Sequence, residues 1–183
     1  SKIMLQNKIF ISKRKVKYPR IELKTGMPVL ILPQDNSLDA VEILDKHKKW
    51  LKQKLEFTEK IKNKYKNQKI YKRSENDLVK LVTNFIDEYS KVLEKKPDKI
   101  SFRYMKTKWA SCSRKNKITF NLILKYLPPR LIRYITFHEM AHLLIPHHNK
   151  DFWFLIKKEF KNYSHLEEEL FGYWFLLQKL IKE

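Results

Sequence analysis

Residues 128–153 read PPRLIRYITFHEMAHLLIPHHNKDFW, and this stretch decides how the 183-residue chain folds. Two adjacent prolines favour the first turn of a helix, where a missing N–H costs nothing. Apolar residues then recur at helical spacing to about Leu144, and Pro146 cannot continue the helix. A second helix is predicted over residues 151–160. The stretch therefore predicts two helices joined by a short loop that contains two histidines.

The first of these helices carries the motif H-E-x-x-H at residues 138–142. Residues four apart lie one turn above each other, so His138 and His142 can bind one Zn²⁺. Glu139 lies about one hundred degrees round the helix, where it can act as general base on a water at the metal. The alternative is a chance match with two packed histidines. It is weakened because the helix is otherwise apolar, and polar groups are costly to bury without partners.

A catalytic zinc site usually has three protein ligands, and the spacing leaves the third ligand open. His147 and His148 follow the motif within six residues. Glu168 and Glu169, on a predicted last helix, are the rival candidates. Glu167 is assigned instead to a capping box at the start of that helix.

The region before residue 74 is predicted to form a small antiparallel β-sheet followed by a helix. Apolar residues recur two apart before residue 24, and Gly26 occupies a turn before the apolar run 29–32. Helical spacing follows over residues 39–60. The basic segment 60–73 is interpreted as the end of that helix and an exposed linker.

The second region combines helices with a β-hairpin. A helix is predicted after Ser74, which begins the N-cap pattern S-x-x-D, and Pro97 closes it. A hairpin is predicted from residues 100–104 and 118–122, with 113–117 as its connection. A last helix begins at the capping box Ser164-x-x-Glu167. The class is therefore α+β, with one domain over 1–183 made of a β-rich part with a helix (1–60) and a catalytic core (74–183).

The composition is strongly basic. Forty Lys and Arg against 20 Asp and Glu give a formal net charge of +20. Such a surface attracts polyanions, including nucleic acid and nucleotides, although Lys can also be simply the default solvent-facing residue.

Rare residue types exclude several classes of protein. The two glycines cannot form G-x-G-x-x-G or a P-loop. The single cysteine, Cys112, excludes an internal disulfide and a Cys-based zinc site, and fits a reducing cytosol. The first 15 residues lack the apolar core of a secretory signal, and no run is long enough to span a membrane. We expect a cytoplasmic protein with no membrane partner.

Three motifs together resemble the YgjP-like family of metal-dependent hydrolases, which is related to SprT- and WLM-type zinc metallopeptidases. They are TKWASCS at 107–113, FHEMAHL at 137–143 and HHNKDFW at 147–153. The resemblance spans about residues 100–153 and implies a zincin-like fold in which the hairpin flanks the H-E-x-x-H helix.

The resemblance also implies roles for single residues. His148 falls on the family's third histidine, which makes His138, His142 and His148 the ligands of one Zn²⁺ per chain. His147 falls on an Asn and would line the site. Two departures are Ala110, where Gly is usual, and Asn149, where Ser is usual. Ala110 would be hard to accommodate if that position needed positive φ.

The same resemblance places the hairpin at the wall of the cleft, where basic residues could bind an anionic substrate. The candidates are Arg103, Lys106, Lys108 and Arg114. Tyr134, one turn before His138, could stabilise an oxyanion, or could simply be a packed tyrosine with a satisfied hydroxyl.

Three functions are compatible with these residues. The first is a zinc metallopeptidase, acting on peptides or on proteins bound to DNA. The second is a pyrophosphatase that hydrolyses a nucleoside triphosphate such as UTP at the same metal site. The third is a basic nucleic-acid-binding domain with structural zinc. Three histidines and a water suit zinc before manganese or nickel. The oligomeric state cannot be read from the sequence.

Overall fold

The computed structural model describes residues 10–24, 27–34 and 40–181. The chain divides into two compact units, residues 1–64 and 65–183. The boundaries expected from the sequence, at residues 60 and 74, lie on either side of this division.

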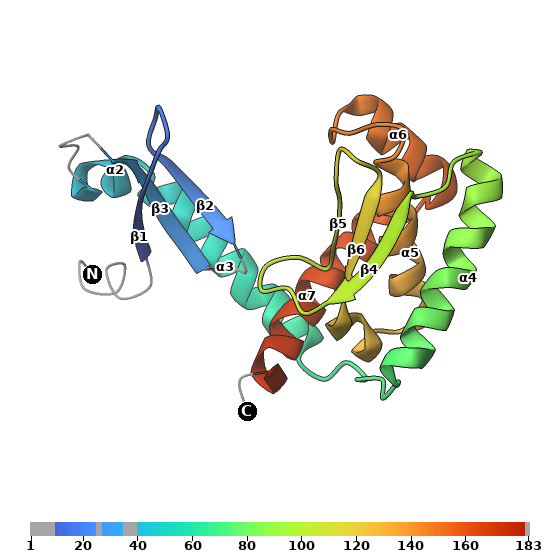
Figure 1. Cartoon of the computed structure of the whole chain (residues 1–183). Coiled ribbons are helices and arrows are strands. Elements are labelled where there is room, and N and C mark those ends of the chain that lie inside the picture. The colour runs from blue at the N-terminus through green and yellow to red at the C-terminus, as the bar shows by residue number, and fades with distance from the viewer. Residues whose placement is uncertain (1–9, 25–26, 35–39, 182–183) are drawn as a thin grey trace. The chain divides into compact units, whose positions relative to one another are not determined.

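The first unit contains a three-stranded sheet whose last strand in the chain lies in the middle (Figure 1). Its strands are β1 (Phe10–Arg14), β2 (Arg20–Lys24) and β3 (Met27–Pro33). β3 pairs in parallel with β1 and antiparallel with β2. The sheet is therefore mixed, and the prediction of an antiparallel sheet is wrong. Leu30, Ile31 and Leu32 are all buried, which suits a central strand covered on both faces.

Helical structure follows this sheet as predicted, but in two pieces. They are α2 (Ala40–Lys46) and α3 (Lys48–Tyr65), which are separated at His47. The predicted turn at Gly26 and the predicted helix start at Asp39 lie outside the described residues.

The second unit begins with α4 (Glu75–Leu93), whose ends follow the sequence signals. The Ser74 side chain accepts a hydrogen bond of 3.0 Å from the Asp77 backbone N–H, which confirms the predicted N-cap. The helix ends at Glu94, which has a left-handed φ of 50°. One apolar face of α4 packs into the core, through Leu78, Val82, Ile86 and Tyr89.

A second three-stranded sheet follows, again with its last strand in the middle. The strands are β4 (Lys99–Arg103), β5 (Ala110–Cys112) and β6 (Lys117–Asn121). β5 and β6 form the antiparallel hairpin, which turns over residues 113–116. β4 runs parallel to β6 on its other side, so the predicted pairing of residues 100–104 within a hairpin is wrong. The central β6 is again the strand with a continuous buried run, residues 118–121.

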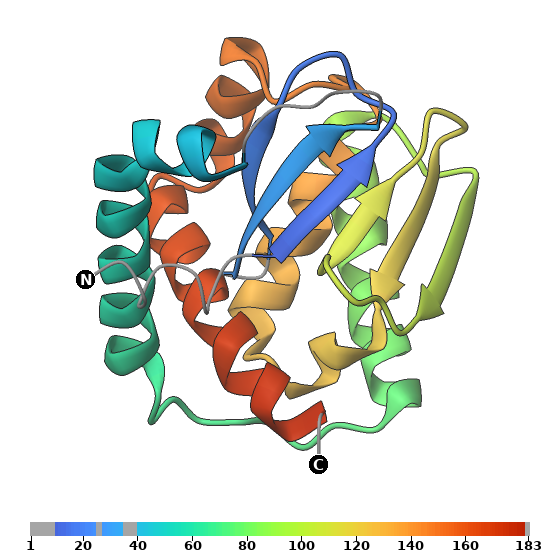
Figure 2. The same ribbon diagram turned by 90° about the vertical axis from the view of Figure 1, so that its left-hand side faces the viewer.

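Three helices complete the unit after the short 3₁₀ helix η1 (Leu122–Tyr126). They are α5 (Pro129–Ala141), α6 (Lys150–Glu159) and α7 (Tyr163–Ile181). Figure 2 shows α5 lying between its neighbours α4 and α7, and β5 of the hairpin also contacts α5. The core of the unit gathers around α5, nine of whose thirteen residues are buried.

The start of α7 differs from the prediction. The helix begins at Tyr163, and the Asn162 carbonyl accepts the backbone N–H groups of His165 and Leu166. Ser164 therefore lies inside the first turn instead of at the N-cap. Glu167, which was expected to complete the capping box, points elsewhere. This frees its carboxylate for the site described below.

The fold is α+β, with two small sheets and helices that follow them. None of the helices within the described residues has the length and apolar character needed to cross a membrane.

The two serines make a matched test of helix capping. We expect Ser74→Ala to lower the free energy of unfolding by about 1 kcal/mol, because it leaves a backbone donor of α4 without its partner. Ser164→Ala should change it by less than about 0.5 kcal/mol, since Ala is favourable inside a helix. Urea denaturation measures the free energy of unfolding of both variants. Equal losses would show that Ser164 caps α7 after all.

Candidate active site

The site is built on the C-terminal end of α5 and on the loop that follows it. Pro129 begins the helix at its first position, and His142 caps its end. Tight turns follow, in which Leu143, Leu144 and Ile145 donate backbone hydrogen bonds of 2.9 to 3.0 Å to the last turn of α5. Pro146 then stops any further helix.

The chain turns back within three residues of Pro146, because a new helix begins at once. The Asn149 side chain caps α6 by accepting a hydrogen bond of 3.0 Å from the Phe152 backbone N–H. Asn149 therefore has the N-capping role that a Ser would also fill. This short loop carries His148 back over the end of α5.

Three imidazole rings converge there. The Nε2 atom of His148 lies 3.0 Å from Nε2 of His138 and 3.1 Å from Nε2 of His142. Tetrahedral Zn²⁺ with Zn–N bonds of about 2.0–2.1 Å requires nitrogen atoms about 3.3–3.4 Å apart. Both distances are close to the spacing of ligands to one ion. The donor atoms of all three histidines lie within 4.8 Å of one another, so these residues form a group that could hold a metal.

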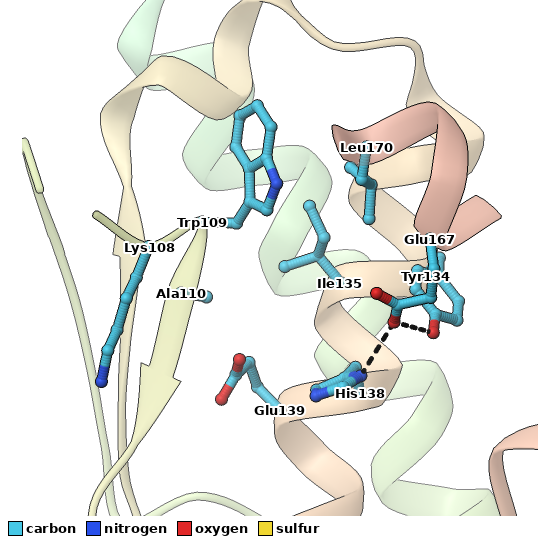
Figure 3. Close-up of a pocket in the computed structure, with 9 residues that line it drawn as sticks. All are labelled: Lys108, Trp109, Ala110, Tyr134, Ile135, His138, Glu139, Glu167 and Leu170. Atoms are coloured by element: carbon cyan, nitrogen blue, oxygen red, sulfur yellow. Dashed lines mark hydrogen bonds and ion pairs between the residues drawn. The ribbon is translucent and has the colours of Figure 1, made fainter. Parts of the chain in front are cut away.

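Each ring is held by its other nitrogen or by an aromatic neighbour. His142 Nδ1 lies 3.0 Å from the Ile145 carbonyl, so that nitrogen donates and Nε2 is left with a lone pair. His138 Nδ1 lies 3.7 Å from a carboxylate oxygen of Glu167, as Figure 3 shows. Two aromatic rings of α6 stack on these imidazoles. Phe152 stacks on His142 with 4.4 Å between ring centroids, and Trp153 stacks on His148 with 5.7 Å between ring centroids.

The rings are also kept neutral, the form in which imidazole binds metals. Burial lowers the pKa of His138 to about 3, and the neighbouring His142 and His148 lower it further. Burial also lowers the pKa of His142 and of His148.

Glu139 lies next to this triad on the side of α5 towards β5, and it lines the same cavity as His138. Its side chain is buried, and burial raises the pKa of its carboxyl to about 7. The positive charge of Lys108 and a hydrogen bond to the Cys112 backbone act in the opposite direction. A carboxyl with a pKa near neutrality can both accept and return a proton at neutral pH.

A cavity of about 220 Å³ opens beside Glu139 and His138. Its walls come from residues 108–110 before and within β5, from α5 and from α7 (Figure 3). Asn121 holds the first wall in place, because its side-chain amide donates hydrogen bonds of 2.8 Å to the carbonyls of Met105 and Lys108. Asn121 is fully buried, although its sequence position alone predicts no role for it.

The sequence-predicted basic residues do not gather at this cavity. Lys108 lines it, whereas Arg103, Lys106 and Arg114 are exposed and lie outside its lining. His147 is exposed and is not part of the histidine triad.

Tyr134 is buried, and its hydroxyl donates a hydrogen bond to Glu167. This agrees with the packed tyrosine that the sequence analysis weighed against an oxyanion stabiliser.

The acidic run of α7 has three separate partners. Glu169 is buried and forms a two-pronged ion pair with Arg130. Glu168 accepts a hydrogen bond of 2.9 Å from the Tyr65 hydroxyl. Glu167 is the member that reaches the histidines, although the sequence analysis set it aside as a capping residue. Its helical spacing from Leu170 and Leu166 was the available signal, because it places Glu167 beside the buried face of α7.

Ala110 does not occupy a left-handed conformation. Among the described residues other than glycine, positive φ occurs at Glu94 and Asn116. The replacement of Gly by Ala is therefore free of backbone strain at this position.

Comparisons with known proteins identify a metallopeptidase family. The family model described as "YgjP-like, metallopeptidase domain" matches residues 57–172. The metallopeptidase zymogen abylysin of Pyrococcus abyssi is 25% identical over 49% of this chain and 90% of its own, with a TM-score of 0.45. The metallopeptidase zymogen jannalysin of Methanocaldococcus jannaschii is 26% identical over 54% of this chain and 96% of its own, with a TM-score of 0.44. No curated protein matches.

The family match covers more than half of the chain and includes all the residues of the site. It supports a metal-dependent peptidase in general. The chain therefore belongs to the YgjP-like family of metallopeptidase domains.

Proposed function

We propose that this chain is a zinc-dependent peptidase in which His138, His142 and His148 hold one Zn²⁺ and Glu139 is the general base. The observation that carries the proposal is the convergence of three Nε2 atoms beside a buried carboxylate with a raised pKa. Family membership supports the metal-dependent peptidase. Zinc itself is inferred from the ligand chemistry.

The donor set fits zinc in three respects. All three donors are imidazole nitrogens, which zinc accepts readily. Their lowered pKa values keep the lone pairs available at neutral pH. Two of the rings already have a polar partner at Nδ1, as metal-binding histidines usually do. Three protein ligands would leave one position of a tetrahedral site open for catalysis.

The metal, when bound, supplies Lewis-acid chemistry: it acidifies water at its open position and polarises the scissile carbonyl. Glu139 takes the proton from the attacking water and delivers it to the leaving amine. Its burial raises the proton affinity of the carboxylate for the first step, and the nearby Lys108 limits that rise. Glu167 orients the His138 ring through its Nδ1 atom, and the Tyr134 hydroxyl in turn donates a hydrogen bond to Glu167.

Hydrolysis of a nucleoside triphosphate has less support than peptide hydrolysis. Two carboxylates, Glu139 and Glu167, line the cavity beside the triad, and both disfavour a phosphate there. Of the basic residues proposed for phosphate binding, only Lys108 is among the residues that line this cavity. Binding of nucleic acid elsewhere on the basic surface, with a net charge of +20, stays an expectation.

A purely structural role for zinc also has less support. The core of the second unit consists of apolar side chains from six elements around α5. His148 is exposed and lies at the edge of this core. The unit therefore has an apolar core that can stabilise its fold without a bound metal.

Replacing Glu139 tests the catalytic role. We expect Glu139→Gln to retain zinc and to lower peptide hydrolysis by about 10²- to 10⁴-fold, because the amide cannot accept the proton. The assay uses zinc-loaded protein, an unstructured protein such as casein as substrate, and elemental analysis of bound zinc. Glu159→Gln, an exposed carboxylate on α6, is the matched control and should keep full activity.

The same proteins are then given a panel of nucleoside triphosphates. Peptide cleavage that survives in Glu139→Gln would refute the assignment of the general base. Glu139-dependent release of phosphate or pyrophosphate, with no peptide cleavage by the unmodified protein, would replace the peptidase with the phosphohydrolase.

Two adjacent histidines provide a test of the ligand set. We expect His148→Ala to weaken zinc binding by about 100-fold or more, since a ligand contributes more than an outer partner. His147→Ala should change the affinity by less than about threefold, because that side chain is exposed and outside the triad. Competition with a zinc-binding dye measures both affinities. A larger loss of zinc affinity in His147→Ala than in His148→Ala would make His147 the third ligand.

Removal of the metal completes this test. The chelator-treated protein should keep a cooperative thermal transition, because the apolar core does not include the ion. A protein that unfolds whenever zinc is removed at room temperature would instead support structural zinc.

A further inference from the structure

We propose that the 220 Å³ cavity beside Glu139 receives a large apolar side chain of the peptide substrate, next to the bond that is cut. This inference rests on the proposed peptidase function and specifies which peptides it favours.

The cavity adjoins the reacting groups directly. Glu139 and His138 both line it, so a side chain inside it belongs to a residue at or beside the scissile bond. Figure 3 shows the Glu139 carboxylate and the His138 ring at one end, with Trp109 and Leu170 at the other. A substrate that fills the cavity is therefore positioned against the general base.

The walls away from the catalytic end are apolar. Ala110, Ile135 and Leu170 are each at most 7% exposed, and Trp109 packs against the core. The Trp109 ring makes an edge-to-face contact with Trp174, with 4.8 Å between ring centroids, which fixes its position. An apolar side chain that enters this space leaves water and contacts walls on three sides, from β5, α5 and α7.

The polar groups of the cavity already have partners. Glu167 accepts the Tyr134 hydroxyl and lies 3.7 Å from His138. Glu139 interacts with the Cys112 backbone and with the charge of Lys108. An acidic side chain would be repelled by both carboxylates. A basic side chain would be attracted by the carboxylates, but it would lose its hydration against walls that are mainly apolar.

The size of the cavity suits one side chain. Pockets for drug-sized ligands have volumes of about 300–1,000 Å³, and this cavity is smaller. It is nevertheless far larger than a single water needs. Leucine, methionine and phenylalanine side chains match it better than alanine does.

Ala110 offers a means of closing the cavity. Figure 3 shows its Cβ directed towards the space between Trp109 and Glu139. A larger residue here would extend into the hollow without backbone strain, because φ is not positive. Leu170, on the opposite wall, allows the cavity to be enlarged.

The experiment uses the zinc-loaded protein and internally quenched peptides that differ at one position beside the cleaved bond. The position carries Ala, Leu, Phe, Lys or Glu, on each side of the bond in turn. We expect the unmodified protein to cleave the Leu or Phe peptide with a kcat/KM at least about tenfold above that of the Ala peptide. The Lys and Glu peptides should be no better than Ala.

Two variants change the cavity in opposite directions. Ala110→Leu should reduce kcat/KM for the Leu and Phe peptides by about tenfold, and for the Ala peptide by less than about threefold. Leu170→Ala should raise the ratio of Phe to Leu cleavage. Val92→Ala, on the exposed side of α4, is the control and should leave all ratios unchanged. Zinc content and thermal denaturation verify that each variant is folded and loaded.

The outcomes separate the inference from the proposed function. If peptides are cut in a Glu139-dependent way but at equal rates for all side chains, the peptidase stands and the cavity assignment is overturned. A preference for Lys or Glu, or an unchanged preference in both Ala110→Leu and Leu170→Ala, also overturns it. If the unmodified protein cuts no peptide, the proposed function fails, and this inference fails with it.

Discussion

Helix α5 must serve as the central helix of the core and also carry two imidazoles and a carboxylate at its end. Nine of its thirteen residues are buried, and Glu139 is among them. Polar groups in such a position are costly unless each has a partner. The surrounding elements meet this constraint: the loop to α6 supplies His148, α7 supplies Glu167, and the residues around β5 supply Lys108 and a backbone hydrogen bond.

The arrangement of partners divides the end of α5 into two sides with different chemistry. His138 and His142 face the returning loop, where aromatic rings of α6 and the Ile145 carbonyl hold the imidazoles. Glu139, about one hundred degrees round the helix, faces β5 and the cavity. A single helical register thus separates the proposed metal ligands from the proposed base. A one-residue shift in the helix would remove both groups from their partners.

Local patterns predicted the helices better than the sheets. The N-cap at Ser74, the proline start of α5 and the helical spacing of α7 depend on nearby residues, and each marked a helix that is present. Strand order depends on distant pairing, so both sheets differ from the predicted hairpins. In each sheet the strand with a continuous buried run is the middle one. An apolar run indicates this at residues 29–32, whereas residues 118–121 alternate apolar and polar side chains, so the continuous burial of β6 was not readable from the sequence.

The site shows the same division between local and distant information. The motif at 138–142 specifies its own geometry, because its residues share one helix. Glu167 lies 29 positions after His138. An apparent capping box at Ser164 explained it locally, so its position beside the buried face of α7 was given no weight. The helix starts at Tyr163, two residues earlier than that explanation requires. The carboxylate consequently turns towards Tyr134 and His138, where it both orients an imidazole and closes one wall of the cavity. The position at which α7 begins therefore decides whether this helix only covers the core or also takes part in the site.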